Sequence, residues 1–269
     1  MNERHTFLEF ARKLARVAEE RILPFYGRCQ VEHKADGSEV TEADRQAERA
    51  MRAAIVARFP DHDILGEEFG TQGRGTTPYR WVIDPLDGTA WFTLGMPTFG
   101  TLVALLEGGQ PVVGVVHFPA LHETLYASRG AGCWFVAQGA QPRRVRVSPQ
   151  TELQRAVASA SGAHSSDILV AEGEVPYGLT RLIRRAGKFN FCPDCLQHAL
   201  VCRGQLHLAV DPVMKPWDSA ALVVCVWEAG GVVSTLGGKQ DDVTFGGSLL
   251  SACTPELCAQ AVEALAPQS

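Results

Sequence analysis

The stretch from Trp81 to Thr89, which reads WVIDPLDGT, carries the densest chemical signal in the chain. Its first three residues are apolar and predict a short buried strand that ends in Asp84. Pro85 and Gly88 predict a sharp exposed turn, which places Asp87 three residues after Asp84. Two carboxylates at the end of a buried strand are costly unless a cation compensates them. On this local pattern alone, a cation site and an ordinary turn with solvated aspartates are equally good interpretations.

Hard divalent cations take oxygen ligands, and Mg²⁺ binds through a few carboxylates together with substrate phosphate. The residues Gly88-Thr89 open a short helix or turn, and its free backbone N–H groups suit an anionic oxygen. A second acidic point is Gly66-Glu67-Glu68, which follows the short apolar run Ile64-Leu65. The sequence therefore offers carboxylates that suit a cation and backbone N–H groups that suit a phosphate.

A third acidic point is Asp218, which follows Lys215-Pro216-Trp217. It is predicted to be the N-cap of a helix over 219–229, and a plain N-cap would explain it. Its flanking Pro216 and Trp217 also favour a carboxylate that is aimed at a fixed point. Both interpretations stay open at this stage.

Apolar residues at three- and four-residue spacing predict helices, and continuous or alternating apolar runs predict strands. The predicted helices cover residues 7–22, 42–59, 179–185, 195–202 and 219–229, with a last helix capped by Thr254. The predicted strands cover residues 81–83, 99–106, 112–118, 124–127, 133–136, 144–147, 157–160, 206–210 and 249–252, and residues 70–77 predict a loop. Thr41 and Asp44 form the pattern of a capping box. The order favours a single domain over 1–269, built of two packed α+β halves, roughly 1–150 and 151–269, with helices on mixed sheets.

The composition is that of an ordinary globular protein, with 269 residues of which 46% are hydrophobic and 20% charged. No apolar run approaches the ~20 residues that a bilayer span needs, and the N-terminus shows no signal-peptide pattern. We therefore expect a cytoplasmic protein with no membrane partner. The net charge is −5, and the basic stretches 143–146 and 181–188 are typical of solvated faces, so no nucleic-acid partner is expected.

The chain has eight cysteines, most of them in apolar surroundings typical of small buried hydrophobes. A chain of this size without a signal peptide does not need disulfides. Cys192 and Cys195 form a C-x-x-C pair, but no second pair with zinc-site spacing accompanies it. A structural role is therefore the simpler expectation for the pair.

The acidic elements, taken together and in order, resemble those of the inositol monophosphatase superfamily. The matching elements are GEE at 66–68, DPLDGT at 84–89, WDSAA at 217–221 and EAGG at 228–231. Members of that superfamily are Mg²⁺-dependent, Li⁺-sensitive phosphomonoesterases. The resemblance implies an αβαβα layered sandwich of the inositol monophosphatase/fructose-1,6-bisphosphatase type, with two or three Mg²⁺ ions per active site.

The resemblance also implies roles for individual residues. The implied metal ligands are Glu67, Asp84, Asp87, the carbonyl of Leu86 and Asp218, with Asp44 near a third, weaker metal. Thr89 would share with Glu67 the task of orienting the attacking water, so the implied catalytic residues are Glu67, Thr89 and Asp84. Asp87 and the amides of Gly88 and Thr89 would hold the phosphate.

The physical chemistry agrees with this assignment. Phosphate-monoester hydrolysis is among the slowest uncatalysed reactions. Two metals about 3.5–4 Å apart can activate a water and stabilise the leaving oxygen in line. No Ser, Cys or His nucleophile is required, so the eight histidines need no catalytic role; His198, near Asp194, is the one of most interest.

Three features resemble the histidinol-phosphatase branch of the superfamily: GMPTFGTL at 95–102, Lys215-Pro216 before Trp217, and Asp194-Cys195 followed by Leu200 and Gly204. Trp91-Phe92 and Leu196 depart from the residues usual in that branch. Inositol phosphates, fructose bisphosphate and adenosine 3′,5′-bisphosphate are the alternative substrates.

Asp194, Asp211 and Asp218 are the predicted substrate-binding residues. Histidinol phosphate carries an ammonium and an imidazole, and anions at the site would favour such a leaving group over a neutral polyol. The simpler interpretations are a turn at Asp211-Pro212 and a helix N-cap at Asp194. Because inositol-type enzymes also carry an acid at the position of Asp211, Asp194 discriminates better.

The sequence thus predicts a Mg²⁺-dependent phosphomonoesterase that converts L-histidinol phosphate to L-histidinol and phosphate, in histidine biosynthesis, and that forms a homodimer. The alternatives are an inositol-1-monophosphatase or another sugar or nucleotide phosphatase of the superfamily. A non-catalytic binding module is a more distant alternative, since it would have lost at least one of the four metal carboxylates, and Glu67, Asp84, Asp87 and Asp218 are all present.

Overall fold

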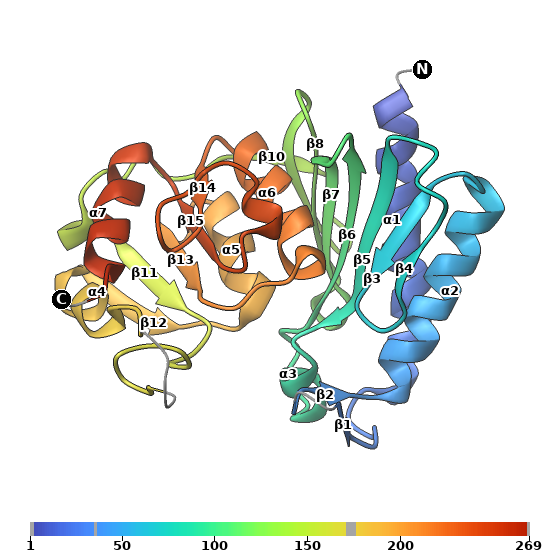
Figure 1. The fold of residues 1–269 in the computed structure, drawn as a ribbon, viewed down its shortest axis with the longest axis horizontal. Coiled ribbons are helices and arrows are strands. Elements are labelled where there is room, and N and C mark those ends of the chain that lie inside the picture. The colour runs from blue at the N-terminus through green and yellow to red at the C-terminus, as the bar shows by residue number, and fades with distance from the viewer. Residues whose placement is uncertain (1–2, 35–36, 171–175, 268–269) are drawn as a thin grey trace.

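The computed structural model describes residues 3–34, 37–170 and 176–267, and it shows helices and sheets stacked in five alternating layers (Figure 1). Two long helices cover the outer face of a large sheet, two helices fill the space between the sheets, and two more cover the outer face of a smaller sheet. In that order the helices are α1 (Glu3–Ile22) and α2 (Glu42–Arg58), α5 (Asp194–Cys202) and α6 (Pro216–Glu228), and α4 (Leu179–Arg185) and α7 (Pro255–Leu265). The expected αβαβα sandwich is confirmed.

The large sheet has eight strands in the order β10-β9-β8-β7-β6-β5-β3-β4. Only β3 and β5 pair in parallel, and the other neighbours are antiparallel. Its strands are β3 (Asp63–Gly66), β4 (Gly70–Gln72), β5 (Tyr79–Asp87), β6 (Gly100–Glu107), β7 (Gln110–Phe118), β8 (Glu123–Ser128), β9 (Gly132–Ala137) and β10 (Arg143–Val145).

The smaller sheet has five strands in the order β12-β11-β13-β15-β14. The first three are parallel to one another, and β15 pairs antiparallel with β13 and β14. Its strands are β11 (Val157–Ala160), β12 (Lys188–Phe191), β13 (Leu208–Asp211), β14 (Val232–Ser234) and β15 (Leu249–Ala252). A two-stranded ribbon of β1 (Glu32–His33) and β2 (Glu39–Val40) lies beside the short helix α3 (Thr89–Thr93) at one end of the large sheet (Figure 1).

The local signals at the two outer helices are confirmed. The apolar residues of α1 are buried against the large sheet, and the helix ends at Ile22, before a 3₁₀ turn that contains Pro24. The helix α2 begins after Thr41 with the expected capping box, in which the Asp44 carboxylate accepts a hydrogen bond from the Thr41 backbone N–H at 2.8 Å. Thr254 likewise caps α7, with Pro255 as its first residue.

Several predicted boundaries were wrong. The strand expected at 81–83 runs from Tyr79 to Asp87, and it passes through Pro85 because its pairing with β6 is interrupted by a register shift between Asp84 and Asp87. Residues Gly70–Gln72, which were expected in a loop, form β4 by pairing with β3. Asp218 is not the N-cap of its helix: α6 begins at Pro216, so Asp218 is the third residue.

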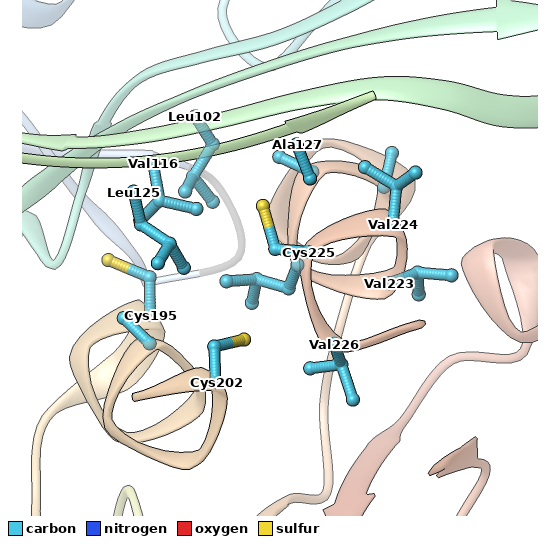
Figure 2. Packing of buried hydrophobic residues seen from close by; sticks show 14 of the residues in the cluster. Leu102, Val116, Leu125, Ala127, Cys195, Cys202, Val223, Val224, Cys225 and Val226 are labelled. Atoms are coloured by element: carbon cyan, nitrogen blue, oxygen red, sulfur yellow. The ribbon is translucent and has the colours of Figure 1, made fainter. Parts of the chain in front are cut away.

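The helix α6 lies between the two sheets and is apolar on nearly all sides, as a helix buried on every face should be. Figure 2 shows Leu102, Val116 and Leu125 of the large sheet above Cys195 and Cys202 of α5, with the Val223–Val226 stretch of α6 to their right. All eight cysteines are free thiols, and six of them are buried, which agrees with their interpretation as small core residues. Within the described residues, no helix combines the length and the apolar character that crossing a bilayer requires.

Gly114 of β7 sets how closely α6 approaches the large sheet. A Cβ atom on Gly114 would lie 2.4 Å from Val224 Cγ1 and 2.5 Å from the Ala221 carbonyl oxygen. We predict that Gly114→Ala lowers the free energy of unfolding in urea by about 1–3 kcal/mol, because the helix must move away. The matched control is Gly237→Ala, where the nearest atom, Thr235 Oγ1, is 3.9 Å away. Equal stability of the two variants would contradict this account of the packing.

Candidate metal and phosphate site

The carboxylates of Asp84 and Asp87 are positioned by the end of β5, just before α3 begins. The register shift in β5 separates Asp84, which is buried, from Asp87, which is half-buried. Gly88 follows with φ 80°, a left-handed conformation that glycine adopts without strain. A Cβ atom there would also lie 2.9 Å from Asp194 Oδ2, so both backbone and space require glycine at this turn.

Asp84, Asp87 and Asp218 each offer a carboxylate oxygen, and these oxygens all lie within 4.8 Å of one another. Burial and the charges of Glu67 and Asp87 raise the pKa of Asp84 well above its usual range. Burial, and then the charge of Asp194, raises the pKa of Asp87 to about 7. Burial and the charge of Asp87 likewise raise the pKa of Asp218. Carboxylate oxygens that repel one another in this way are suited to bind a hard divalent cation.

Glu67 lies in the turn after β3 and lines the same cavity. Lys34 Nζ donates hydrogen bonds to Glu67 Oε1 at 2.7 Å and to Glu68 Oε1 at 2.6 Å. Burial raises the pKa of Glu68 to about 7, although its hydrogen bond with Lys34 opposes the shift. Lys34 therefore supplies a positive charge at the rim of the acidic cluster. Sequence reasoning did not single it out, because nothing near Lys34 in the chain shows that it will meet residues 67 and 68.

Asp44 and Thr89 meet across the edge of the site, although they are 45 residues apart. Thr89 Oγ1 lies 3.2 Å from Asp44 Oδ1 and 3.1 Å from the Leu86 carbonyl oxygen, two acceptors that share its single hydroxyl proton. The other oxygen of Asp44 accepts from the Thr41 backbone at 2.8 Å and from its hydroxyl at 2.6 Å. Burial raises the pKa of Asp44. Asp44 is thus bound to Thr41 and Thr89 and stands outside the three-carboxylate group.

These groups surround a cavity of about 540 Å³. Its lining includes every predicted site residue except Asp44: Glu67, Asp84, Leu86, Asp87, Gly88, Thr89, Asp194, Asp211 and Asp218. The sequence analysis missed several other lining residues, among them Glu39, Ser161, His164, Val213 and Met214. These come from loops and strand ends with no distinctive motif.

Of the three predicted substrate-binding carboxylates, Asp218 belongs to the three-carboxylate group, and Asp194 and Asp211 line the cavity outside it. Asp194 is the first residue of α5, whose N-cap is Pro193, so the alternative interpretation of Asp194 as an N-cap is wrong. A hydrogen bond from the Trp91 side chain reaches Asp194, but burial dominates and raises its pKa. Asp211 ends strand β13; its carboxylate lies 3.4 Å from the donor Gln197 Nε2, and burial raises its pKa as well.

His198 does not belong to the candidate site. It is fully buried, its Nδ1 lies 2.8 Å from Ser251 Oγ, and burial lowers its pKa to about 3. It is absent from the cavity lining. A neutral histidine in this position acts as a core residue, which agrees with the structural interpretation of the sequence.

Known proteins resemble this chain over almost its whole length. The sequence model of the inositol monophosphatase family matches residues 3–266. A histidinol-phosphatase of Chlorobaculum parvum is 37% identical over 247 residues, which are 91% of each chain. A fructose-1,6-bisphosphatase/inositol-1-monophosphatase of Thermotoga maritima is also 37% identical, over 87% of this chain and 86% of its own. The solved structure of a Thermotoga maritima IMPase covers 96% of both chains with a TM-score of 0.83 and 32% identity. The chain therefore belongs to the inositol monophosphatase family, and it is a phosphoric monoester hydrolase.

Proposed function

We propose that this protein is a Mg²⁺-dependent phosphomonoesterase that hydrolyses L-histidinol phosphate with a metal-activated water. The observation that carries the metal dependence is the convergence of the Asp84, Asp87 and Asp218 oxygens within 4.8 Å of one another. Without a cation the ionised forms of these carboxylates oppose folding. Among the described residues, the histidines and cysteines that line the cavity are His164, which is exposed, and Cys195, which is buried. The donor set fits Mg²⁺ by its chemistry.

In this mechanism the metal would be held by Asp84, Asp87, Asp218, Glu67 and the Leu86 carbonyl. A Mg²⁺ ion bound there would supply positive charge to the phosphate oxygens and would lower the pKa of a water. The chain's own residues then position the reactants. The Thr89 hydroxyl, which is hydrogen-bonded to Asp44 at 3.2 Å, orients the water together with Glu67, and the Gly88 and Thr89 amides hold the phosphate.

Asp44 is assigned here to the orientation of Thr89. Its hydrogen bonds with Thr41 and Thr89 support this role. A third, weaker metal near Asp44, the homodimer and the cytoplasmic location stay predictions.

The acidic wall of the cavity supports a cationic substrate. Asp194 and Asp211 both line the cavity, outside the three-carboxylate group. Histidinol phosphate can place its ammonium or imidazolium there, whereas a neutral polyol leaves the charges unpaired. A related protein with 37% identity carries the name histidinol-phosphatase.

Inositol-1-monophosphatase is the second candidate, because a relative of equal identity is named fructose-1,6-bisphosphatase/inositol-1-monophosphatase. A panel of kcat/KM values separates the two. The substrates are histidinol phosphate, inositol 1-phosphate, fructose 1,6-bisphosphate and adenosine 3′,5′-bisphosphate, each with Mg²⁺ and with EDTA. We expect the highest kcat/KM for histidinol phosphate, and no hydrolysis of any of the substrates in EDTA. A highest value for inositol 1-phosphate would favour the second candidate, and no Mg²⁺-dependent hydrolysis at all would favour a binding module.

We predict that Asp84→Asn abolishes turnover, because a neutral amide is a poor metal ligand, and that it leaves the fold intact. The pKa of Asp84 is raised in the folded protein, so its ionised form opposes folding at neutral pH and this cost disappears as the pH falls. The metal-free variant should therefore melt no lower than wild type in EDTA, and Mg²⁺ should raise the Tm of wild type only. The control is Asp61→Asn, which removes one charge from the surface. Near-normal activity of Asp84→Asn at saturating Mg²⁺ would refute the assignment.

We predict that Asp194→Ala lowers kcat/KM for histidinol phosphate by roughly 30-fold or more, since breaking a desolvated charge pair costs on the order of 2–5 kcal/mol. Hydrolysis of p-nitrophenyl phosphate should hardly change, because its leaving group carries no positive charge. As a control, Asp167→Ala removes an aspartate whose carboxylate accepts from the Thr180 backbone at 2.8 Å outside the cavity. Equal losses on both esters would show that Asp194 is structural.

A further inference from the structure

Glu48 is a buried carboxylate that the mechanism above does not use. It lies on α2, one helical turn after Asp44, and its exposed fraction is 0%. Its Oε2 accepts a hydrogen bond from the Glu68 backbone N–H at 2.7 Å, and its Oε1 accepts from the Phe69 N–H at 3.2 Å and from Arg52 Nε at 2.7 Å. A carboxylate buried so completely is stable only because each oxygen is engaged.

The backbone groups that Glu48 holds belong to the turn that carries Glu67. Arg52 binds the next residues of the same segment, since it donates hydrogen bonds to the Gly70 carbonyl at 2.5 Å and to Gln72 Oε1 at 3.3 Å. Gly66 permits this close approach: a Cβ atom there would lie 2.2 Å from Glu48 Oε1 and 2.9 Å from Arg52 Nη2. The pair Glu48–Arg52 thus clamps the chain from Gly66 to Gln72 onto α2.

Glu67 depends on this clamp because its own side chain has little else to hold it. Within the described residues, its carboxylate makes one hydrogen bond, to Lys34. Its direction into the cavity is therefore set by the backbone of the turn. We propose that Glu48 is a positioning residue, which acts through the Glu68 and Phe69 amides to fix the Glu67 carboxylate in the metal site.

The helix α2 then serves both groups that orient the water. Asp44 on its first turn holds the Thr89 hydroxyl, and Glu48 four residues later holds the Glu67 turn. Residues four apart lie on one helix face. This rigid spacing fixes Thr89 and Glu67 relative to each other, although they come from different strand ends. The inference rests on the proposed function, since it assigns Glu48 to that site.

The test is Glu48→Gln, which keeps the size of the side chain but replaces one acceptor oxygen by a donor. One of the two turn amides then loses its partner. The matched control is Glu228→Gln, because the Glu228 carboxylate accepts in the same way from the Gly130 and Gly132 N–H groups, at 2.8 and 2.7 Å. Glu228 is ten residues after Asp218 on α6, which places it roughly 15 Å from the metal site at 1.5 Å per residue.

Three quantities are measured for wild type and both variants: the Mn²⁺ dissociation constant by electron paramagnetic resonance without substrate, the Mg²⁺ concentration for half-maximal hydrolysis of p-nitrophenyl phosphate, and the Tm in EDTA. We expect Glu48→Gln to weaken Mn²⁺ binding and raise the half-maximal Mg²⁺ concentration by about 10- to 100-fold, as loss of an outer partner of a metal ligand does. Glu228→Gln should change only the Tm.

Metal binding by Glu48→Gln that equals that of Glu228→Gln, with a lower Tm in both, would overturn the proposal and leave the phosphatase function standing. Wild type that neither binds Mn²⁺ nor hydrolyses with Mg²⁺ would instead refute the function. If Glu48→Gln is recovered only unfolded, Glu48→Asp is measured, because it keeps the negative charge beside Arg52 but its shorter side chain draws the carboxylate back from the Glu68 and Phe69 amides. Weaker Mn²⁺ binding by Glu48→Asp supports the proposal, and unchanged binding overturns it.

Discussion

The mutual repulsion of Asp84, Asp87 and Asp218 is the constraint on which the rest of the structure depends. Three carboxylates whose oxygens lie within 4.8 Å of one another are held in place against their own charges. The surrounding layers hold these residues in place: Asp84 and Asp87 lie at the end of a strand of an eight-stranded sheet, and Asp218 lies in the first turn of a helix buried between two sheets. The stability of the core is what allows a destabilising cluster to persist.

The same constraint explains how distant segments share the site. The large sheet provides Asp84, Asp87 and the turn with Glu67, while α5, β13 and α6 provide Asp194, Asp211 and Asp218. In the proposed function, the first group would bind the metal and the phosphate. The second adds acids where the leaving group would lie. Related proteins could thus share the first group of residues and differ in the second, and so act on different substrates. This is consistent with relatives of equal identity that carry different enzyme names.

Most of this arrangement could be predicted from the sequence, because its strongest signals are local. The DPLDGT element, the capping box at Thr41 and the apolar face of α1 each depend on residues close in the chain. The predictions failed where pairing between distant segments decides the structure. Strand β4 forms only because β3 lies beside it, and β5 continues past Pro85 because a bulge removes the need for its missing donor. Three features of the site also depend on contacts between distant segments, and no local sequence pattern predicts them. They are the contact of Lys34 with Glu67, the clamp by Glu48 and the cavity wall at His164.

The central claim is that the converging carboxylates form a divalent-cation site. Crystals grown in saturating Mn²⁺ and measured at the manganese absorption edge test it most directly. The account predicts an anomalous density peak within bonding distance of carboxylate oxygens of Asp84, Asp87 and Asp218. An ordered cavity with no anomalous peak beside these three residues would contradict it.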